Sequence, residues 1–525
     1  MLSSLLNSVT LTEPLMPAAA TKLASDIAAA TGWQPYLTSL VVQRAVLFFL
    51  ARRATEKRLC LLWKKGTAPD LLGDFCGERF AARVDGEEAD CQAGYLDHTN
   101  ALGLRKHFPF LQPQVMGVRP AFGAGDRLGL ATPAHVRAVR GTGLTPFFAQ
   151  QSIREMTRTG RTPDEVMDSA VFGVFQEGWR EGFGADADHL KTKEDVDATA
   201  AAGFTMFTID PGDHVENAAQ TDDIVTLKKK FEALPWLELE TATDEMCERC
   251  IDKSVRLPDG TVVSLNEEAL FRAAVKYGRA LAHTKSMYRH LKAVMVDRPF
   301  ELEMSVDETA TPTSVAEHVF VASELHRLGV KWVSLAPRFV GEFEKGVDYI
   351  GDLGEFERTF AQHVAVAQHF GPYKISIHSG SDKFSIYPIA AQLAGDLLHL
   401  KTAGTSYLEA LRAIATIDPA LFREILGFAI ERYPTDRASY HVSADAAKVP
   451  SPKSLSDADL GGVLNEFDGR EVVHVTFGSV LTTHVDGKPR FRDRLMQALE
   501  SAEEIHYETV RAHIEKHVRP FARAH

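Results

Sequence analysis

The stretch that decides the fold of this chain is Lys374-Ile375-Ser376-Ile377-His378-Ser379-Gly380-Ser381-Asp382-Lys383-Phe384. Its first half alternates as a β-strand does: Ile375 and Ile377 fall on one face, and the polar residues, His378 included, fall on the other. Its second half, Ser-Gly-Ser-Asp, has the composition of a turn. A histidine at the end of a strand, followed by a loop of small residues, is typical of a site at the mouth of a parallel barrel.

Short apolar strands recur along the chain, each followed by a polar turn and usually by a helical pattern. The predicted strands are residues 128–132, 145–150, 183–189, 205–210, 300–305, 332–336, 374–378 and 397–401. Strands that alternate with helices imply parallel pairing, and eight such units close a (β/α)8 barrel. A doubly wound open sheet is the alternative, but the glycines of residues 123–129 have the wrong spacing for a dinucleotide fingerprint and precede their strand. We therefore predict an α/β, TIM-like barrel and no nucleotide cofactor.

The barrel is predicted to span residues 116–445. Residues 1–115 mix patterns, with helices expected at 21–30 and 39–53 and a strand at 58–64, and are predicted to form an N-terminal α/β extension. Residues 211–297 interrupt the alternation of strands and helices between the fourth and fifth strands. We interpret them as an insertion at the catalytic end and a candidate lid. Residues 446–525 are predicted to be a helical region packed on the barrel. The charged face of their last helix, at about 491–517, suits the outside of the molecule or a second copy in a homo-oligomer.

Composition narrows the class of protein. The chain has 525 residues, a net charge of −13 and 45% hydrophobic residues, as in ordinary globular proteins, and the acidic balance argues against nucleic-acid binding. Five scattered cysteines indicate a reducing compartment, and the single CxxC at Cys247 and Cys250 fits two helix cysteines better than a metal or redox site. Residues 1–20 lack the features of a signal peptide and the longest apolar run is too short for a membrane span. We expect a cytoplasmic protein without membrane or nucleic-acid partners.

The carboxyl ends of the strands converge in a parallel barrel, and here they carry polar residues. Asp188 and His189 end the third strand, Asp210 the fourth and His378 the seventh, and Glu303 interrupts an apolar fifth strand. Such residues are costly to bury unless they are paired or bind a metal. Imidazole and carboxylate ligands suit Zn, Mn, Ni, Co or Fe(II). We predict a divalent-metal site built by His189, His378 and a third ligand, for which the candidates are Glu303, Asp210, His214 and His441.

Each candidate also has a purely structural interpretation. His378 could be a hydrogen-bonded histidine of the barrel interior, and His441, in a polar run beyond the barrel, suits a surface or capping role equally well. Asp188 suits either an acid/base or a partner that orients His189. Among the cations, Arg338 could clamp a carboxylate bidentately or form a salt bridge with Glu342. Lys401 could bind an anion, form a Schiff base or pair with a carboxylate of the rim.

Seven separate motifs carry a family resemblance. They are GDRLGLATP (125–133), QQSIRE (150–155), DHLK (188–191), EMSVDE (303–308), LAPRF (335–339), IHSGSDK (377–383) and LKTAGT (400–405). Together, across roughly residues 118–445, they resemble the bacterial tagaturonate epimerase family. The resemblance implies a divalent-metal-dependent isomerase of hexuronate metabolism that interconverts D-tagaturonate and D-fructuronate, with a small ketouronate as substrate.

The resemblance also implies residue roles. It points to Asp188 and Glu303 as the catalytic acid/base pair and to His189 and His378 among the metal ligands, and we predict His441 as the third ligand. The residues predicted to bind substrate are Arg127, Gln151, Arg338, Ser379 and Lys401.

The chemistry of the two ketouronates restricts the mechanism, because they differ at a carbon β to the ketone whose hydrogen is not acidified. Retro-aldol cleavage and re-addition through a metal-stabilised enediolate can invert this carbon, and so can transient oxidation by a nicotinamide. The missing dinucleotide fingerprint favours the first route. The alternatives are a metal-dependent aldolase or a ketose 3-epimerase on the same barrel, or a non-catalytic sugar-acid-binding protein.

Overall fold

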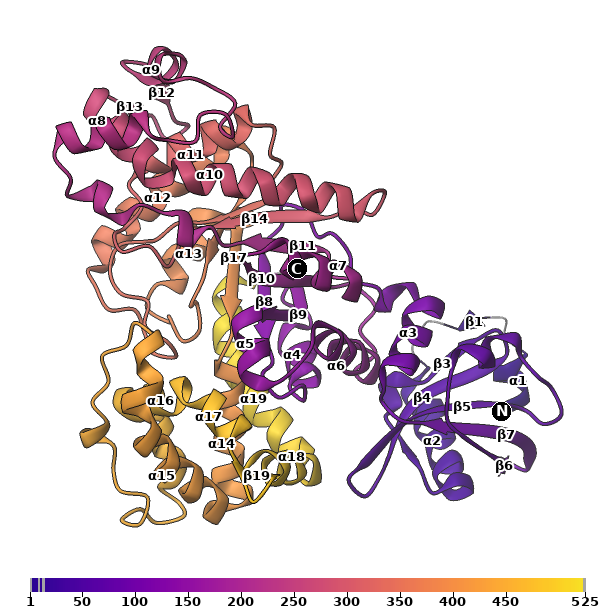
Figure 1. Cartoon of the computed structure of the whole chain (residues 1–525). Coiled ribbons are helices and arrows are strands. Elements are labelled where there is room, and N and C mark those ends of the chain that lie inside the picture. Colours follow the sequence, from indigo (N-terminus) through magenta and orange to yellow (C-terminus); the bar gives the residue numbers. More distant parts are fainter. Residues whose placement is uncertain (1, 8–9, 12–14, 523–525) are drawn as a thin grey trace.

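The predicted (β/α)8 barrel is confirmed by the computed structural model, which describes residues 2–7, 10–11 and 15–522 (Figure 1). Eight parallel strands close in the order β10-β11-β14-β15-β16-β17-β8-β9. Their bounds are β8 Ala121–Gly125, β9 Thr145–Ser152, β10 Gly184–Leu190, β11 Met206–Ile209, β14 Glu301–Ser305, β15 Ser334–Ala336, β16 Lys374–Ile377 and β17 Leu398–Thr402. Seven of these overlap the predicted strands.

The prediction of the first strand, at residues 128–132, was wrong. The strand is β8, whose sequence Ala-Phe-Gly-Ala-Gly carries too little apolar side chain to be recognised. Its small residues have a packing reason, because a Cβ on Gly125 would lie 2.7 Å from the backbone of Ala403. Residues 128–131 instead form a turn in which the Asp126 carboxylate accepts hydrogen bonds from the backbone N–H groups of Leu128, Gly129 and Ala131.

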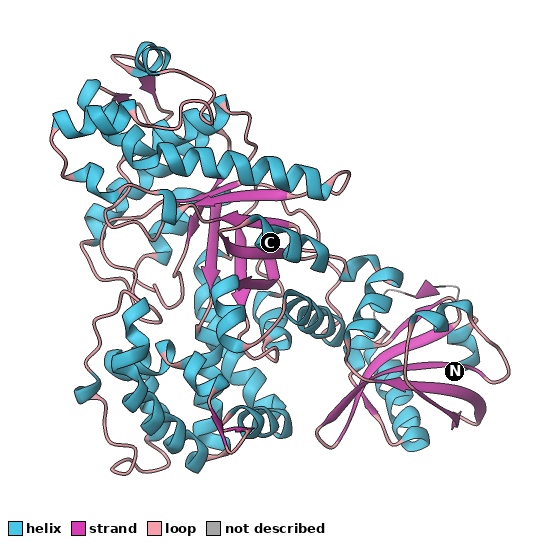
Figure 2. Ribbon diagram, in the orientation of Figure 1, coloured by secondary structure: helices cyan, strands magenta, loops and turns pink. Residues whose placement is uncertain are grey.

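Helices surround the barrel strands (Figure 2). They are α4 Thr132–Val139, α5 Ile153–Thr159, α6 Pro163–Gln176, α7 Lys193–Ala202, α10 Glu267–Met295, α11 Val315–Arg327, α12 Leu353–Phe370, α13 Tyr387–Ala394 and α14 Thr405–Ile417. Reciprocal capping boxes define the starts of α6, α7 and α11. The strands give apolar side chains such as Ile375 and Ile377 to the helix-packed core, whereas Glu303, Lys374 and Lys401 are buried polar residues of the same strands. The barrel interior is therefore unusually polar.

The N-terminal region is a separate antiparallel sheet beside the barrel (Figure 1). Its elements are α1 Leu2–Leu6, β1 Thr10–Leu11, α2 Pro17–Thr31, β2 Gln34–Pro35, β3 Val41–Gln43, β4 Val46–Arg53, β5 Glu56–Lys64, β6 Glu78–Val84, β7 Glu87–Gly94 and α3 His98–His107. The helix predicted at 39–53 was wrong, because this apolar run forms β3 and β4. Both faces of β4 are buried, with Phe48 in the main core and Phe49 in the core under α2, so the run lacks the alternation that marks a half-exposed strand.

Residues 211–297 form a helical layer along one side of the barrel, around the long helix α10, which packs between α7 and α11 (Figure 1). Its other elements are α8 Ile224–Glu232, α9 Thr243–Cys250 and the hairpin β12 Ser254–Arg256 with β13 Val262–Ser264. Cys247 and Cys250 lie on α9 as free thiols, as expected for helix cysteines. Among the described residues, no helix has both the length and the apolar character needed to cross a bilayer.

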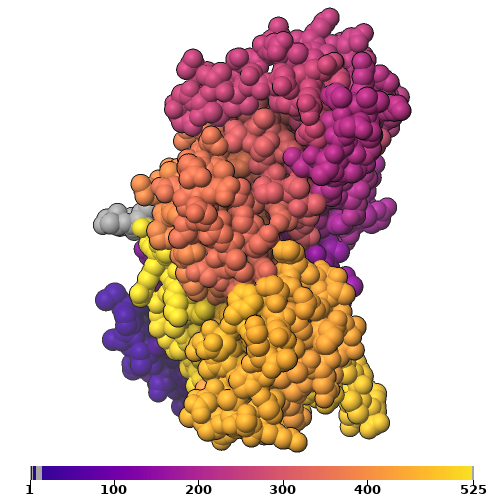
Figure 3. Space-filling view, turned by 90° about the vertical axis from the view of Figure 1, so that its left-hand side faces the viewer, coloured from indigo at the N-terminus to yellow at the C-terminus, as the bar shows by residue number. Residues whose placement is uncertain are grey.

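The C-terminal region is a helical layer with a core of its own. Its elements are α15 Pro419–Asp436, α16 Phe467–Val475, α17 Phe477–Thr482, β18 His484–Val485, β19 Lys488–Pro489, α18 Arg492–Ser501 and α19 Glu503–Val518. The single helix expected at 491–517 is thus two helices, and α19 packs on α4 and α14 of the barrel. In Figure 3 these helices, orange to yellow, lie opposite the magenta insertion, with the barrel segments between them.

A pair of buried carboxyl groups connects α16 to the loop that follows β15. The backbone N–H of Ala444 donates to Glu471 Oε2 at 3.0 Å, and Ser443 donates its N–H and its hydroxyl to Glu344 Oε2 at 2.9 and 2.8 Å. Burial and the neighbouring Glu344 raise the pKa of Glu471 from 4.5 to about 8. At neutral pH, Glu471 therefore carries the proton that this pair shares.

Glu471→Gln is expected to remove a pH-dependent loss of stability. In the unfolded chain Glu471 ionises near pH 4.5, whereas in the folded chain it keeps its proton until about pH 8, so the stability that it contributes is present at pH 4 and is lost as the pH rises to about 8. An amide keeps a donor toward Glu344 and does not ionise. Thermal unfolding should be measured at pH 5 and pH 9. Relative to the wild type, the melting temperature of the variant should be higher by about 1 to 3 °C at pH 9 than at pH 5. Parallel pH profiles for the two proteins would contradict the shared proton.

Candidate active site

Two histidines face each other at the carboxyl end of the barrel. His189 ends β10 and His378 follows β16, and the Nε2 of His189 lies 3.2 Å from the Nδ1 of His378. Both loops are held in unusual backbone conformations, since His189 and Ser379 have φ angles of 52° and 48°. Non-glycine residues in this left-handed region are strained, and such strain is concentrated at functional sites.

The remote nitrogen of each ring contacts a carboxylate. His189 Nδ1 lies 3.1 Å from Asp210 Oδ2, and His378 Nε2 lies 2.6 Å from Glu303 Oε1. A metal-bound histidine commonly donates its other N–H to a carboxylate in this way, which orients the ring and increases its basicity. The two nitrogens that face each other are therefore the ones free to bind a metal ion.

Carboxylates flank the gap between the rings. Asp307 Oδ1 lies 3.5 Å from His378 Nδ1, and Asp188 Oδ2 lies 3.9 Å from His189 Nε2. Burial would lower the pKa of both histidines, but the carboxylates raise it to about 9 for His189 and about 10 for His378. The surroundings thus favour positive charge between the rings, and a divalent cation would replace these protons. Nitrogen and carboxylate donors at this spacing fit a metal of the predicted class.

The predicted third ligands lie elsewhere. Asp210 and Glu303 bind the remote ring nitrogens, and His214 stacks on His283 with ring centroids 4.2 Å apart. The side chain of His441 is 69% exposed and its Nε2 lies 2.8 Å from Glu342 Oε2. The structure brings Asp188 and Asp307 to the gap instead. Asp307 follows the end of β14 by two residues. Its position just after a strand was the one sequence signal that could have identified it as a site residue.

Beneath the histidines, Lys401 neutralises a group of buried acids. Its Nζ lies 2.6 Å from Asp186 Oδ2, 2.7 Å from Glu303 Oε1 and 3.1 Å from Asp188 Oδ1. Burial alone would raise the pKa of Glu303, but Lys401 and His378 hold it well below its usual range, whereas burial raises the pKa of Asp186 to about 6. Lys401 therefore pairs with carboxylates of the protein, one of the three roles expected for it.

Two adjoining cavities open at this rim, of about 240 Å³ and 40 Å³. Their linings share the residues Arg154, Lys345, His378, Ser379 and Tyr440. Asp188, Gln150 and Lys401 line the smaller cavity and Asp307 lines the larger one, whereas Glu303 lines neither. The insertion of residues 211–297, interpreted from the sequence as a candidate lid, contributes no described residue to either lining. Tyr440, His441 and His474, which follow the barrel strands in the chain, line the cavities instead.

The cations predicted to bind substrate are engaged with the protein. Arg127 Nε donates to Glu155 at 2.7 Å and its guanidinium stacks on Phe477, and Gln151 also donates to Glu155. Arg338 donates to the carbonyl of Thr309 at 2.7 Å and pairs with Glu342 at 3.2 Å, so the expected structural alternative for Arg338 is present.

Lys345 is a cavity cation that sequence reasoning missed. Its Nζ donates to the Ser379 hydroxyl at 2.5 Å. It lies in the long loop between β15 and α12, which shows no periodic pattern in the sequence, so the sequence carried no mark of its place in the cavity.

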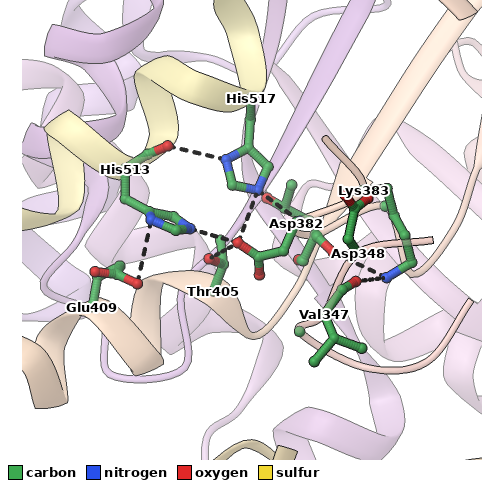
Figure 4. Close-up of polar contacts among 12 residues, drawn as sticks. Val347, Asp348, Asp382, Lys383, Thr405, Glu409, His513 and His517 are labelled. Atoms are coloured by element: carbon green, nitrogen blue, oxygen red, sulfur yellow. Dashed lines mark hydrogen bonds and ion pairs between the residues drawn. The ribbon is translucent and has the colours of Figure 1, made fainter. Parts of the chain in front are cut away.

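A second cluster of possible metal ligands, Asp382, His513 and His517, is already engaged in hydrogen bonds and ion pairs (Figure 4). His517 Nε2 accepts the backbone N–H of Asp382 at 2.9 Å, and His513 Nε2 lies 2.6 Å from Asp382 Oδ1. The guanidinium of Arg470 lies 3.0 Å from the same Asp382 oxygen and 3.2 Å from His513 Nε2. A metal ion would have to displace this positive charge, so the cluster is an ion-pair network that anchors the loop after β16 to α16 and α19.

A family model, a curated sequence and solved structures each match almost the whole chain. A family model described as tagaturonate epimerase matches residues 36–521. A curated tagaturonate/fructuronate epimerase of Thermotoga maritima is 45% identical over 487 residues, which cover 93% of this chain and 96% of that protein. Crystal structures of a fructuronate-tagaturonate epimerase from Cohnella laeviribosi, native and with glycerol, superpose with a TM-score of 0.87 at 36% identity and cover 96% of this chain and 99% of theirs.

Proposed function

This chain belongs to the tagaturonate epimerase family, and we propose that it interconverts D-tagaturonate and D-fructuronate with the help of a bound divalent metal ion. The observation that carries the proposal is the pair of facing nitrogens of His189 and His378, 3.2 Å apart beside two cavities. Each ring is oriented by a carboxylate on its other side, which is the arrangement of a metal centre.

We assign the metal to His189, His378 and Asp307. Asp307 accepts a hydrogen bond from the Ser305 hydroxyl at 2.5 Å and lies 3.5 Å from His378 Nδ1, whereas Asp188 is already paired with Lys401. A divalent ion held there would supply Lewis-acid polarisation of the substrate ketone. Zn, Mn, Ni, Co and Fe(II) are all compatible with this donor set.

Inversion then follows from breaking and remaking one carbon–carbon bond. A base takes the proton of the hydroxyl on the β carbon, the bond between the α and β carbons breaks, and its electron pair passes toward the ketone to give an enediolate, while the β carbon becomes an aldehyde. The aldehyde turns and the α carbon attacks its other face. The new alkoxide takes back a proton, so that atoms and charges balance.

Two carboxylates are proposed to move this proton. Asp188 lines the smaller cavity and can reach a substrate hydroxyl directly. Glu303 lies one layer lower, where Lys401 and His378 separate it from the cavity. We propose that Glu303 takes part through these two neighbours, as the second member of the acid/base pair.

The proposed substrate-binding residues differ in their access to the cavities. Ser379 lines both, Arg127 and Lys401 line the smaller one, and Arg338 lines the larger one. Gln151 supports Arg127 through their shared partner Glu155. Arg127 and Gln151 are therefore proposed to shape the wall of the smaller cavity.

The test is a time course in D2O with D-tagaturonate and metal-stripped protein, before and after addition of Zn, Ni or Mn, read by proton NMR on quenched and chelated samples. Fructuronate is expected only with metal, and without deuterium at the inverted carbon, because no C–H bond breaks there. Absence of conversion with every metal would refute the proposal. Free cleavage products would instead indicate an aldolase, and deuterium at the α carbon a ketose 3-epimerase.

A further inference from the structure

One cation of the cavities differs from the others in its charge balance. Arg127, Arg154, Arg338 and Lys401 line the cavities, and each is ion-paired with a glutamate or aspartate. Lys345 lines both cavities and is half-buried. Within the described part of the chain it forms no ion pair, and the Ser379 hydroxyl is its hydrogen-bond partner. Glu308, which also lines the larger cavity, interacts electrostatically with Lys345 from beyond ion-pair distance. Because no carboxylate of the described residues is bonded to it, the ammonium group can still bind an anion.

The loop around Lys345 is held rigidly. The carbonyl of the residue before it, Glu344, accepts from buried Lys383 Nζ at 2.7 Å, and the carbonyl of the residue after it, Gly346, accepts from Arg470 Nε at 2.6 Å. The Glu344 carboxylate is also bound by Ser443. A charged group fixed on both sides before the ligand arrives loses little conformational entropy on binding.

The chemistry of the proposed reaction says which anion has to be held. In both ketouronates the carboxylate lies on the β-carbon side of the bond that breaks. Cleavage therefore leaves it on the three-carbon aldehyde, 2-hydroxy-3-oxopropanoate, whereas the other fragment is the enediolate of dihydroxyacetone. The aldehyde must rotate and present its other face to the enediolate without leaving the site. A group that binds the carboxylate of the aldehyde throughout would serve as the pivot of this rotation.

We propose that Lys345, together with the Ser379 hydroxyl, binds the substrate carboxylate and retains the aldehyde fragment between cleavage and re-addition. The inference rests on the proposed epimerase function. It makes Lys345 the residue that keeps the enzyme an epimerase and prevents it from acting as an aldolase. Without the lysine, the aldehyde escapes, the remaining enediolate takes a proton at its α carbon, and dihydroxyacetone is released.

Lys345→Met tests this with two readouts. The KM for D-tagaturonate should rise about 10- to 100-fold, as expected for loss of one charge-assisted hydrogen bond. The fraction of turnovers that release dihydroxyacetone, assayed by its NADH-dependent enzymatic reduction, should also rise at least several-fold. Lys345→Arg, which keeps the charge, should restore much of both. Ser379→Gly, which suits the left-handed backbone at this position, should show a smaller change in the same direction.

The matched control is Lys228→Met, which removes an exposed lysine of α8 and should match the wild type in both readouts. If Lys345→Met keeps a wild-type KM and releases no more dihydroxyacetone than Lys228→Met, the carboxylate role is overturned. The same holds if Lys345→Met only lowers kcat. A wild-type enzyme that does not epimerise D-tagaturonate with any metal would refute the proposed function itself, which is a different result.

Discussion

Glu303→Gln is expected to lower kcat by about 10²- to 10⁴-fold at saturating metal, the range found when a proton-transferring side chain is removed. Its carboxylate lies 2.6 Å from His378 Nε2 and 2.7 Å from Lys401 Nζ, at zero exposure. The amide has nearly the same shape but no charge, so it leaves Lys401 with one fewer counter-ion and cannot exchange a proton. The measurement is steady-state epimerisation, together with metal affinity determined by titration of the stripped protein.

The metal titration separates two roles for Glu303. If it only orients His378, the variant should bind metal about 10- to 100-fold more weakly and recover its kcat in excess metal. If it belongs to the acid/base pair, as proposed, kcat should stay low when the metal site is full. Near-native turnover would exclude the acid/base role. Glu301→Gln is the matched control, because Glu301 is a buried glutamate on the same strand that contacts the backbone of Gly117, away from the histidines.

Arg470→Met is expected to destabilise the folded protein by about 3 to 5 kcal/mol, because it leaves buried carboxylates without their counter-ion. The guanidinium lies 3.0 Å from Asp382 Oδ1 and 3.1 Å from Glu409 Oε1, and all three side chains are almost fully buried. His513, which also contacts Asp382 (Figure 4), would remain beside the carboxylate. Thermal and denaturant unfolding of the full chain would measure the loss.

Arg494→Met is the matched control for Arg470→Met. Arg494 makes a bidentate pair with Glu424 at 2.8 and 2.9 Å, but both side chains are 48% exposed. Exposed pairs of this kind contribute about 0 to 1 kcal/mol. If the two variants unfold at the same temperature, the network around Asp382 does not anchor the C-terminal helices to the barrel as the contacts imply.

Much of the fold could be predicted because local patterns carry it. The barrel strands that follow β8 are short stretches in which apolar residues recur or alternate with polar ones, with turn residues after them. The capping boxes that start α6, α7 and α11 are local as well. The exceptions have a shared cause. β8 is built of small residues because Ala403 packs against Gly125, and β4 is buried on both faces by two different cores. In both strands the residue types suit a tertiary contact. Local propensity alone therefore predicts a different structure from the same residues.

For the site, the sequence by itself determined which strand ends carry imidazole and carboxylate, and so placed Asp188, His189, Glu303 and His378 at one rim once the barrel was assumed. The tertiary structure alone decided which of these side chains meet and which lie beneath the others. Glu303 lies under the cavity because it points into the barrel one layer below His378.

Lys345 is the clearest case of what only the tertiary structure decides. Distances between loops depend on packing across the whole rim, and no short-range sequence pattern encodes them. Lys345 enters the cavity because Lys383 and Arg470, from distant parts of the chain, hold the backbone on either side of it. The chemistry at a strand end follows from a residue and its local period, whereas the chemistry of an irregular loop follows from the contacts that fix the loop.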